Sequence, residues 1–358
     1  MWYFAPSTRS MVINSAGRCQ YHNDDYFRMK HLASRPLLLT GLFLLSIGSI
    51  IHASIAGSVS MDLSTWWSAL IHPQGLDGEM LWRLRLPRAF AAWTVGAMLA
   101  MSGCLMQVLL RNPLADPYIL GVSGGAAFAA LAGMTLGVAA NFIPLLAMGG
   151  ALVSILIVFG LARGSGPWSG TRLLLTGVVT AAGWGSLISL ILATGSDGSL
   201  RGMLFWLMGD FSYAVLPGWA VFALLVGIGL TMALARSLNV LSMGETTAKL
   251  LGESTQYLMW LVYGLASLLT AAAVSIAGSI GFVGLIVPHL MRLLVGSDHR
   301  ILIPAATLFG GLFLVLSDTL ARTILAPRQL PVGVITAILG VPLFLVLLNR
   351  TRLKGPDS

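Results

Sequence analysis

The sequence predicts an all-α polytopic membrane protein with about ten transmembrane helices. Of its 358 residues, 56% are hydrophobic and 9% are charged, whereas soluble domains carry roughly 25% charged residues. The mean hydropathy is +0.86, and long apolar runs follow one another almost to the C-terminus. Each run is long enough to cross roughly 30 Å of hydrocarbon at about 1.5 Å per residue.

Ten apolar runs are candidate spans. Spans seven and eight form one nearly unbroken apolar stretch that is too long for a single crossing, so we expect a turn near Gly278 and Ser279. The ten spans are Leu37–Ile55, Ala89–Leu110, Ile119–Ala140, Ile143–Ala162, Leu173–Thr194, Val215–Ala235, Tyr257–Ala277, Ile280–Val295, Ile301–Leu320 and Leu330–Leu348.

The segments outside the spans divide the chain into one membrane domain, 36–350, a polar N-terminal extension, 1–35, and a short tail, 351–358. The extension is expected to be irregular, or to result from a start assigned upstream of Met29, which opens a basic and then apolar segment. The same segment, with Ala53-Ser54-Ile55-Ala56 after it, also resembles a signal peptide, and that alternative stays open.

The basic residues indicate how the chain is oriented in the bilayer. With the N-terminus inside, cytoplasmic segments hold fifteen of the 21 lysines and arginines, so both termini are expected in the cytoplasm of a bacterial inner membrane. Because these residues are scattered through short loops, the net charge of +8 is no nucleic-acid footprint. Six arginines fall outside and need an explanation: Arg83, Arg85, Arg88, Arg201, Arg322 and Arg328.

Three segments between the spans contain features beyond simple turns. The outer segment Gly57–Arg88 contains a tryptophan pair suited to the membrane interface. The outer segment Gly195–Ala214 is apolar enough for a short interfacial helix. The inner segment Arg236–Gln256 contains "MGETTAKLLGES", which has helix-forming character and glycines at both ends.

The stretch "GVSGG", Gly121 to Gly125, resembles a nucleophile pattern around Ser123. A hydrolase elbow needs a preceding strand, which a membrane helix excludes. An intramembrane protease would need a histidine partner, and His289 in span eight is the candidate. A lone histidine beside a proline at a helix end is more often structural, so we expect Ser123 to be a packing or path-lining residue.

Other chemistry has little support in the sequence. No histidine pair has metal-ligand spacing, and Cys19 and Cys104 are not expected to form a disulfide. No G-x-x-x-x-G-K-[ST] phosphate-binding loop occurs, so the chain has no such ATPase site. Asp318 is the clearest acid within a span and lies one helical turn before Arg322. A secondary transporter would ordinarily bury more ionisable groups.

Five ordered motifs resemble those of the permease subunits of type II ABC importers for iron–siderophores, haem and vitamin B12 (the FecCD-type family). They are "RLRLPRAFAAWTVGAMLAMSGCLMQVLLRNPLADPYILGVSGGAA", "TRLLLTGV", "MGETTAKLLG", "AGSIGFVGLIVPHLMRLLVGSDHR" and "LSDTLARTILAPRQLPVGVITAILGVPLF". The resemblance runs from about Leu37 to Leu348. It implies the type II importer permease fold, with ten helices per subunit.

The resemblance also implies partners and no enzymatic activity. It predicts a second permease subunit (in a homodimer or a heterodimer), two cytoplasmic ATPases and a periplasmic substrate-binding protein. No cofactor is expected on this chain, and ATP and magnesium would be used by the partner ATPases. Iron(III)–siderophore is the leading cargo, with haem and cobalamin as alternatives and a secondary transporter or intramembrane protease as remote ones.

Site residues follow from the family pattern by position. The ATPase-coupling loop corresponds to Gly244, Glu245, Ala248, Lys249, Leu251 and Gly252. Docking of the binding protein corresponds to Arg85, Arg88 and Arg322, which would explain three of the outer arginines. The cytoplasmic gate corresponds to Ser169, Gly170 and Thr171, although a relative carries a hydroxyl residue where Gly170 stands. The glycine-rich start of span three corresponds to Gly121, Ser123, Gly124 and Gly125.

Overall fold

The computed structural model describes residues 11–13, 19–21, 24–57, 61–163, 170–212 and 217–352. Within these residues the fold is a bundle of helices, preceded by a two-stranded antiparallel hairpin in which Met11 lies opposite Tyr21. The hairpin strands are β1 (Met11–Ile13) and β2 (Cys19–Tyr21). The all-α membrane fold is therefore confirmed.

Short helices alternate with long ones along the chain. The elements are α1 (Asp24–Ile55), α2 (Leu63–Ile71), α3 (Leu76–Glu79), the π-helix η1 (Met80–Arg85), α4 (Leu86–Leu109), the 3₁₀-helix η2 (Pro117–Leu120), α5 (Val122–Thr135), the 3₁₀-helix η3 (Ala140–Phe142), α6 (Ile143–Arg163), α7 (Gly170–Thr194), α8 (Asp197–Leu207), α9 (Gly218–Ala233), α10 (Ala235–Ser242), α11 (Glu245–Leu250), α12 (Thr255–Ala277), α13 (Val283–Val295), α14 (His299–Thr323) and α15 (Val332–Arg352).

Each of the ten expected spans coincides with helix in the described chain. Six helical segments are long and apolar enough to cross a membrane, and α9 with α10 forms a seventh that is bent by 59°. The remaining three spans correspond to shorter apolar helices, α5, α13 and part of α15. The expected turn between spans seven and eight is present, because α12 ends at Ala277 and Gly278 has a φ of +69°.

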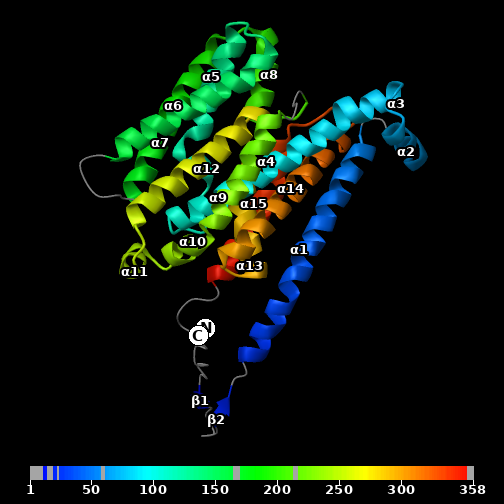
Figure 1. Cartoon of the computed structure of the whole chain (residues 1–358). Helices are drawn as coiled ribbons and strands as arrows, with labels where there is room; N and C mark the ends of the chain where they lie inside the picture. The colour runs from blue at the N-terminus through cyan, green and yellow to red at the C-terminus, as the bar shows by residue number, and fades with distance from the viewer. Residues whose placement is uncertain are drawn as a thin grey trace.

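The two ends of the bundle carry different short elements (Figure 1). We call the end that bears α10 and α11 the inner end, and the end that bears α2, α3 and α8 the outer end. The start of α1 lies toward the inner end in Figure 1. The helix α1 begins at Asp24, so helix extends twelve residues into the segment 1–35 that was expected to be irregular.

Helix α4 lies at the centre of the bundle. It packs against α1, α9, α12, α13 and α14, and 89% of its most apolar window is buried, compared with 6% for α7. The bundle therefore has its core around α4, and α7, which contacts α5, α6 and η2, is the least buried of the six long spans.

Two glycine pairs bring α4 into backbone contact with its neighbours. A Cβ added to Gly96 would overlap the carbonyl oxygen of Gly310 on α14, and a Cβ added to Gly103 would overlap that of Gly284 on α13. These contacts confirm that small residues permit close helix approach in a bilayer, where apolar burial alone does not drive association.

Candidate functional site

The inner loop that precedes α12 folds as a short helix held between two glycines. Gly244 and Gly252 have φ values of +113° and +84°, which residues with a Cβ rarely adopt. Between them, Lys249 Nζ lies 2.7 Å from Glu245 Oε1, the helical i, i+4 arrangement that supports a solvated helix. The expected short helix is therefore confirmed as α11.

One side of α11 is anchored and the other is exposed. Ala248 is fully buried, its carbonyl accepts from the amide of Glu253 at 3.0 Å, and Ser237 on α10 donates to Glu253 Oε1 at 2.9 Å. Leu250 and Leu251 are 83% and 62% exposed. Exposed leucines at the tip of a fixed helix form a small apolar surface that suits a protein partner.

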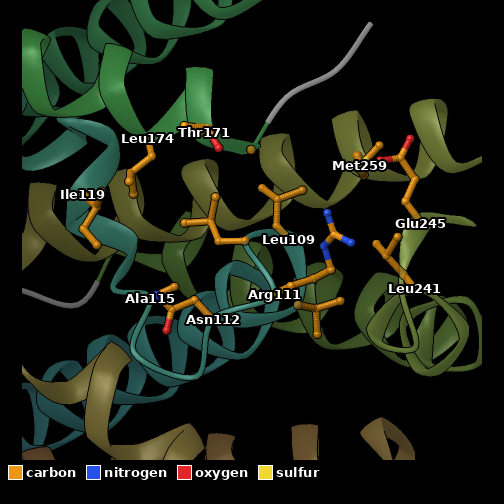
Figure 2. Close-up of a pocket in the computed structure, with 13 residues that line it drawn as sticks. Leu109, Arg111, Asn112, Ala115, Ile119, Thr171, Leu174, Leu241, Glu245 and Met259 are labelled. Atoms are coloured by element: carbon orange, nitrogen blue, oxygen red, sulfur yellow. The ribbon is translucent and has the colours of Figure 1, made fainter.

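A pocket of about 340 Å³ lies beside α11 at the inner end. It brings together two of the expected gate residues, Gly170 and Thr171, with Glu245 of the coupling loop. Figure 2 shows Thr171 and Leu174 across the pocket from Asn112 and Arg111, with Glu245 and Met259 farther along it. Ser169, the third expected gate residue, lies outside the described residues.

The loop 110–116 supplies pocket residues that the sequence analysis missed. Arg111 has a φ of +48°, a conformation that is uncommon for residues other than glycine. Asn112 Oδ1 accepts from the amide of Leu114 at 2.9 Å, which fixes a turn. The Asn-Pro dipeptide was the available signal, because it favours turns.

The loop ends in η2, whose polar side chains are partly withdrawn from water. Asp116 Oδ1 accepts from the amide of Tyr118 at 2.8 Å, and burial raises the pKa of the Asp116 carboxyl to about 6. The Tyr118 hydroxyl accepts from the amide of Ile280 at 3.1 Å, and burial also raises its pKa. Through these bonds η2 joins the start of α5 to the turn before α13.

The glycine cluster at the start of α5 packs tightly. Gly121 caps the helix with a φ of +71°, and Ser154 donates to its carbonyl at 2.8 Å. A Cβ on Gly125 would overlap the carbonyl oxygen of Gly150 on α6, and one on Gly124 would lie 2.9 Å from Trp184 Cβ. Ser123 is half-buried and makes no side-chain hydrogen bond within the described chain.

The three outer arginines expected to dock a binding protein form one buried cluster with Asp318. Arg88 Nη2 and Nε lie 2.8 and 3.0 Å from the two Asp318 oxygens. Arg322 Nε lies 3.1 Å from Asp318 Oδ2, so the expected ion pair within α14 is confirmed. Its Arg88 partner, 230 positions earlier in the chain, was not expected.

The same arginines also cap the end of α1. Arg85 donates to the carbonyls of Ser54 and Ile55 at 3.0 and 2.7 Å, and Arg322 donates to that of Ala53 at 3.1 Å. The last carbonyls of a helix have no partner within it, and cations are favourable there. The structure thus buries Arg85 and Arg322 and leaves only Arg88 part-buried, although exposed side chains would suit the expected docking role better.

A second cavity, of about 750 Å³, opens at the outer end. One face of α8, the end of α12 and the loop at Gln329 line it. Gln329 Oε1 also accepts from Arg88 Nη1 at 3.0 Å, so the cavity wall and the arginine cluster share one side chain.

Comparisons with known proteins agree with this geometry. Residues 39–350 match the model of the FecCD transport family. The chain is 44% identical to the cobalamin import system permease BtuC of Halobacterium salinarum, over 76% of the chain and 74% of the relative. It is 37% identical to the iron(3+)-hydroxamate import permease FhuB of Bacillus subtilis (88% and 83%). It is 38% identical to the hemin transport permease HmuU of Yersinia pestis (89% and 97%).

A solved structure shares the fold. It is described as an inward-facing conformation of a putative metal-chelate type ABC transporter. It superimposes with a TM-score of 0.78 at 33% identity, covering 88% of this chain and 99% of the other. The residues that match the family model extend from within the first span to the end of the tenth, and include residues 244–252 and the arginine cluster. The chain is therefore a type II ABC importer permease and belongs to the FecCD transport family.

Proposed function

We propose that this chain is one of two permease subunits of an ATP-driven, binding-protein-dependent importer that carries an iron(III)–siderophore complex across a bacterial inner membrane. The second subunit is either an identical copy or a related permease. The low burial of α7 supports a second subunit, because only 6% of its most apolar window is buried within this chain. Its exposed face includes Gly183, Gly185 and Ser186, and small residues suit helix–helix contact better than contact with lipid.

The observation that carries the proposal is α11. The helix is anchored through Ala248 and Glu253, yet it presents two exposed leucines away from the bundle. The sequence has no phosphate-binding loop of its own, so the energy for transport has to arrive through a surface of this kind. A cytoplasmic ATPase that grips residues 244–252 would move α11 when it closes on ATP.

The pocket beside α11 is the proposed cytoplasmic gate. Its opposite walls come from the start of α7, with Gly170 and Thr171, and from the loop at Asn112. Glu245 lines the same pocket, so displacement of α11 would change its shape directly. The importer would thus alternate between outward-open and inward-open states around a central path.

The outer arginine cluster is the proposed docking site for the binding protein. Arg88 and Arg322 share one carboxylate, Asp318, while Arg85 binds the last carbonyls of α1, so the three arginines carry two positive charges in excess. An excess of positive charge attracts acidic residues on a partner and steers association. Because Arg88 is the least buried of the three, it is the first that an incoming carboxylate would meet. The adjoining outer cavity is then the proposed entrance for the cargo.

The cargo is the least constrained part of the proposal. Relatives named for cobalamin, iron hydroxamate and hemin share 37 to 44% identity with the chain. Iron(III)–siderophore leads because the family resemblance favours it, and haem and cobalamin are the alternatives.

Reconstitution tests the proposal. Proteoliposomes that contain the permease pair and its ATPase should accumulate ferric siderophore only when ATP is inside the vesicle lumen that represents the cytoplasm and loaded binding protein is outside. Parallel reactions with hemin and cobalamin identify the cargo, and a hydrolysis-deficient ATPase is the control. Uptake driven by a proton gradient without ATP would contradict the proposal in favour of a secondary transporter. Cleavage of a peptide that depends on Ser123 would favour a protease.

A further inference from the structure

The helix before the coupling loop is bonded on both sides. On one side Ser237 of α10 donates to Glu253 Oε1 at 2.9 Å, which ties α10 to the segment that follows α11. On the other side Asn239 of α10 bonds to the first residues of α14. Leu238 and Leu241, also on α10, are buried against the bundle. Thus α10 bridges α11 and α14.

Both the NH₂ group and the oxygen of the Asn239 side-chain amide bond to the start of α14. Nδ2 donates to Asp298 Oδ1 at 2.8 Å, and a carboxylate oxygen only accepts, which places the NH₂ group on that side. Oδ1 then accepts from the backbone amide of His299 at 2.9 Å and from His299 Nδ1 at 2.6 Å. His299 is 1% exposed, so water does not compete for these bonds.

Helix α14 connects this contact to the other end of the molecule. Its 25 residues span about 37 Å at 1.5 Å per residue. Pro304 lies in the second turn of α14, and the rest of the helix continues without proline to Thr323. Asp318 and Arg322 lie in its last turns and bind Arg88 of α4 and the carbonyls of α1.

We infer that Asn239 is a positioning residue that makes α10 and the N-terminus of α14 move as one body, so that α14 links the coupling helix α11 to the outer arginine cluster. This inference rests on the proposed function. Movement of α11 by the ATPase would displace α14 along or about its axis and change the geometry of Asp318 and Arg88. By reciprocity, binding at the outer cluster would bias α11.

The test compares two variants of the assembled permease–ATPase complex in lipid. Asn239→Leu has a similar volume but cannot bond Asp298 or His299. Ser242→Ala removes a hydroxyl from the same helix, where it bonds only the carbonyl of Asn239. We expect Asn239→Leu to assemble and to retain basal ATPase activity, but to lose at least fivefold of the stimulation by loaded binding protein, within the range typical of coupling between sites. Ser242→Ala should keep the wild-type stimulation.

A covalent cross-link in place of the Asn239 contact distinguishes a loss of coupling between α10 and α14 from a loss of folding. In a background with Cys19→Ser, the pair Asn239→Cys and His299→Cys is joined by a short thiol cross-linker. Stimulation should be low before cross-linking and should recover afterwards, because the cross-link restores the connection without the amide.

The outcomes distinguish this inference from the proposed function. Wild-type stimulation in a folded Asn239→Leu complex, or no recovery of stimulation on cross-linking, would overturn the role of Asn239 and leave the importer proposal intact. Absence of any ATPase association or stimulation in the wild-type complex would overturn both.

Discussion

The outer arginine cluster and the inner pocket differ in how completely the chain satisfies its own polar groups. At the outer end, Asp318 is 1% exposed and pairs with Arg88 and Arg322. Arg88 also donates to the side chain of Gln329, and Arg322 donates to the carbonyl of Ala53. At the inner end, Arg111 and Asn112 are exposed around an open pocket, and the leucines of α11 face outward. The outer end joins α1, α4 and α14 through bonds within the chain, whereas the inner end leaves polar and apolar side chains exposed to a partner.

This difference indicates where substitutions should affect folding and where they should affect transport. A buried charge that loses its partner destabilises the fold strongly, whereas an exposed side chain seldom does. Substitutions at the outer cluster should therefore change stability first, and substitutions on α11 should change activity alone.

The largest expected effect follows from Asp318→Ala. The change leaves Arg88 and Arg322 without their shared carboxylate, and breaking a buried ion pair in this way costs about 3–5 kcal/mol. Denaturation of the purified chain in detergent measures the loss. Glu79→Gln is the control, because Glu79 pairs with Arg83 at 3.8 Å in an exposed position. Equal midpoints for the two variants would show that the ion pairs of Asp318 do not stabilise the fold.

Leu250→Asp tests the inner end. Because Leu250 is 83% exposed, the unfolding midpoint should stay at the wild-type value, while ATP-driven uptake should fall about tenfold or more if the leucine is a central contact. Leu76→Asp is matched to it, since Leu76 is 89% exposed on α3 at the outer end. Equal uptake by the two variants would remove the functional distinction between the ends.

Asp116→Asn should change the pH dependence of the free energy of unfolding. Burial raises the pKa of Asp116 to about 6 from a model-peptide value of 3.8, so between these values the folded chain binds more protons than the unfolded chain. Its contribution to the free energy of unfolding should fall as pH rises from about 4 to 6. The asparagine variant should lack this slope, which is at most about 1.4 kcal/mol per pH unit. Denaturant titrations across this range measure it, and an unchanged slope would assign the pH dependence elsewhere.

Ser123→Ala should have the smallest effect. The serine makes no side-chain hydrogen bond within the described residues, and alanine fits the same space, so uptake should stay within about twofold of wild type. If uptake were abolished while assembly and ATPase coupling stayed intact, Ser123 would have a chemical role.

Hydropathy located the spans because a bilayer selects apolar segments of a fixed length, and the glycines marked α11 because its ends need positive φ. The surroundings of the outer arginines could not be predicted in the same way. Arg88 and Asp318 are far apart in the sequence. The carbonyls that bind Arg85 and Arg322 belong to the backbone, and every residue type has one, so the sequence does not mark them. The contact between Asn239 and His299 escaped for the same reason, since both lie in segments that hydropathy reads as loops.

The glycine crossings of α4 bear on how these two ends communicate. Where Gly96 meets Gly310 and Gly103 meets Gly284, the contacts are made largely by backbone, and Ala100 and Leu314 contribute Cβ atoms beside the first pair. An alanine at any of the four positions would place a Cβ too close to the neighbouring element and force the two apart.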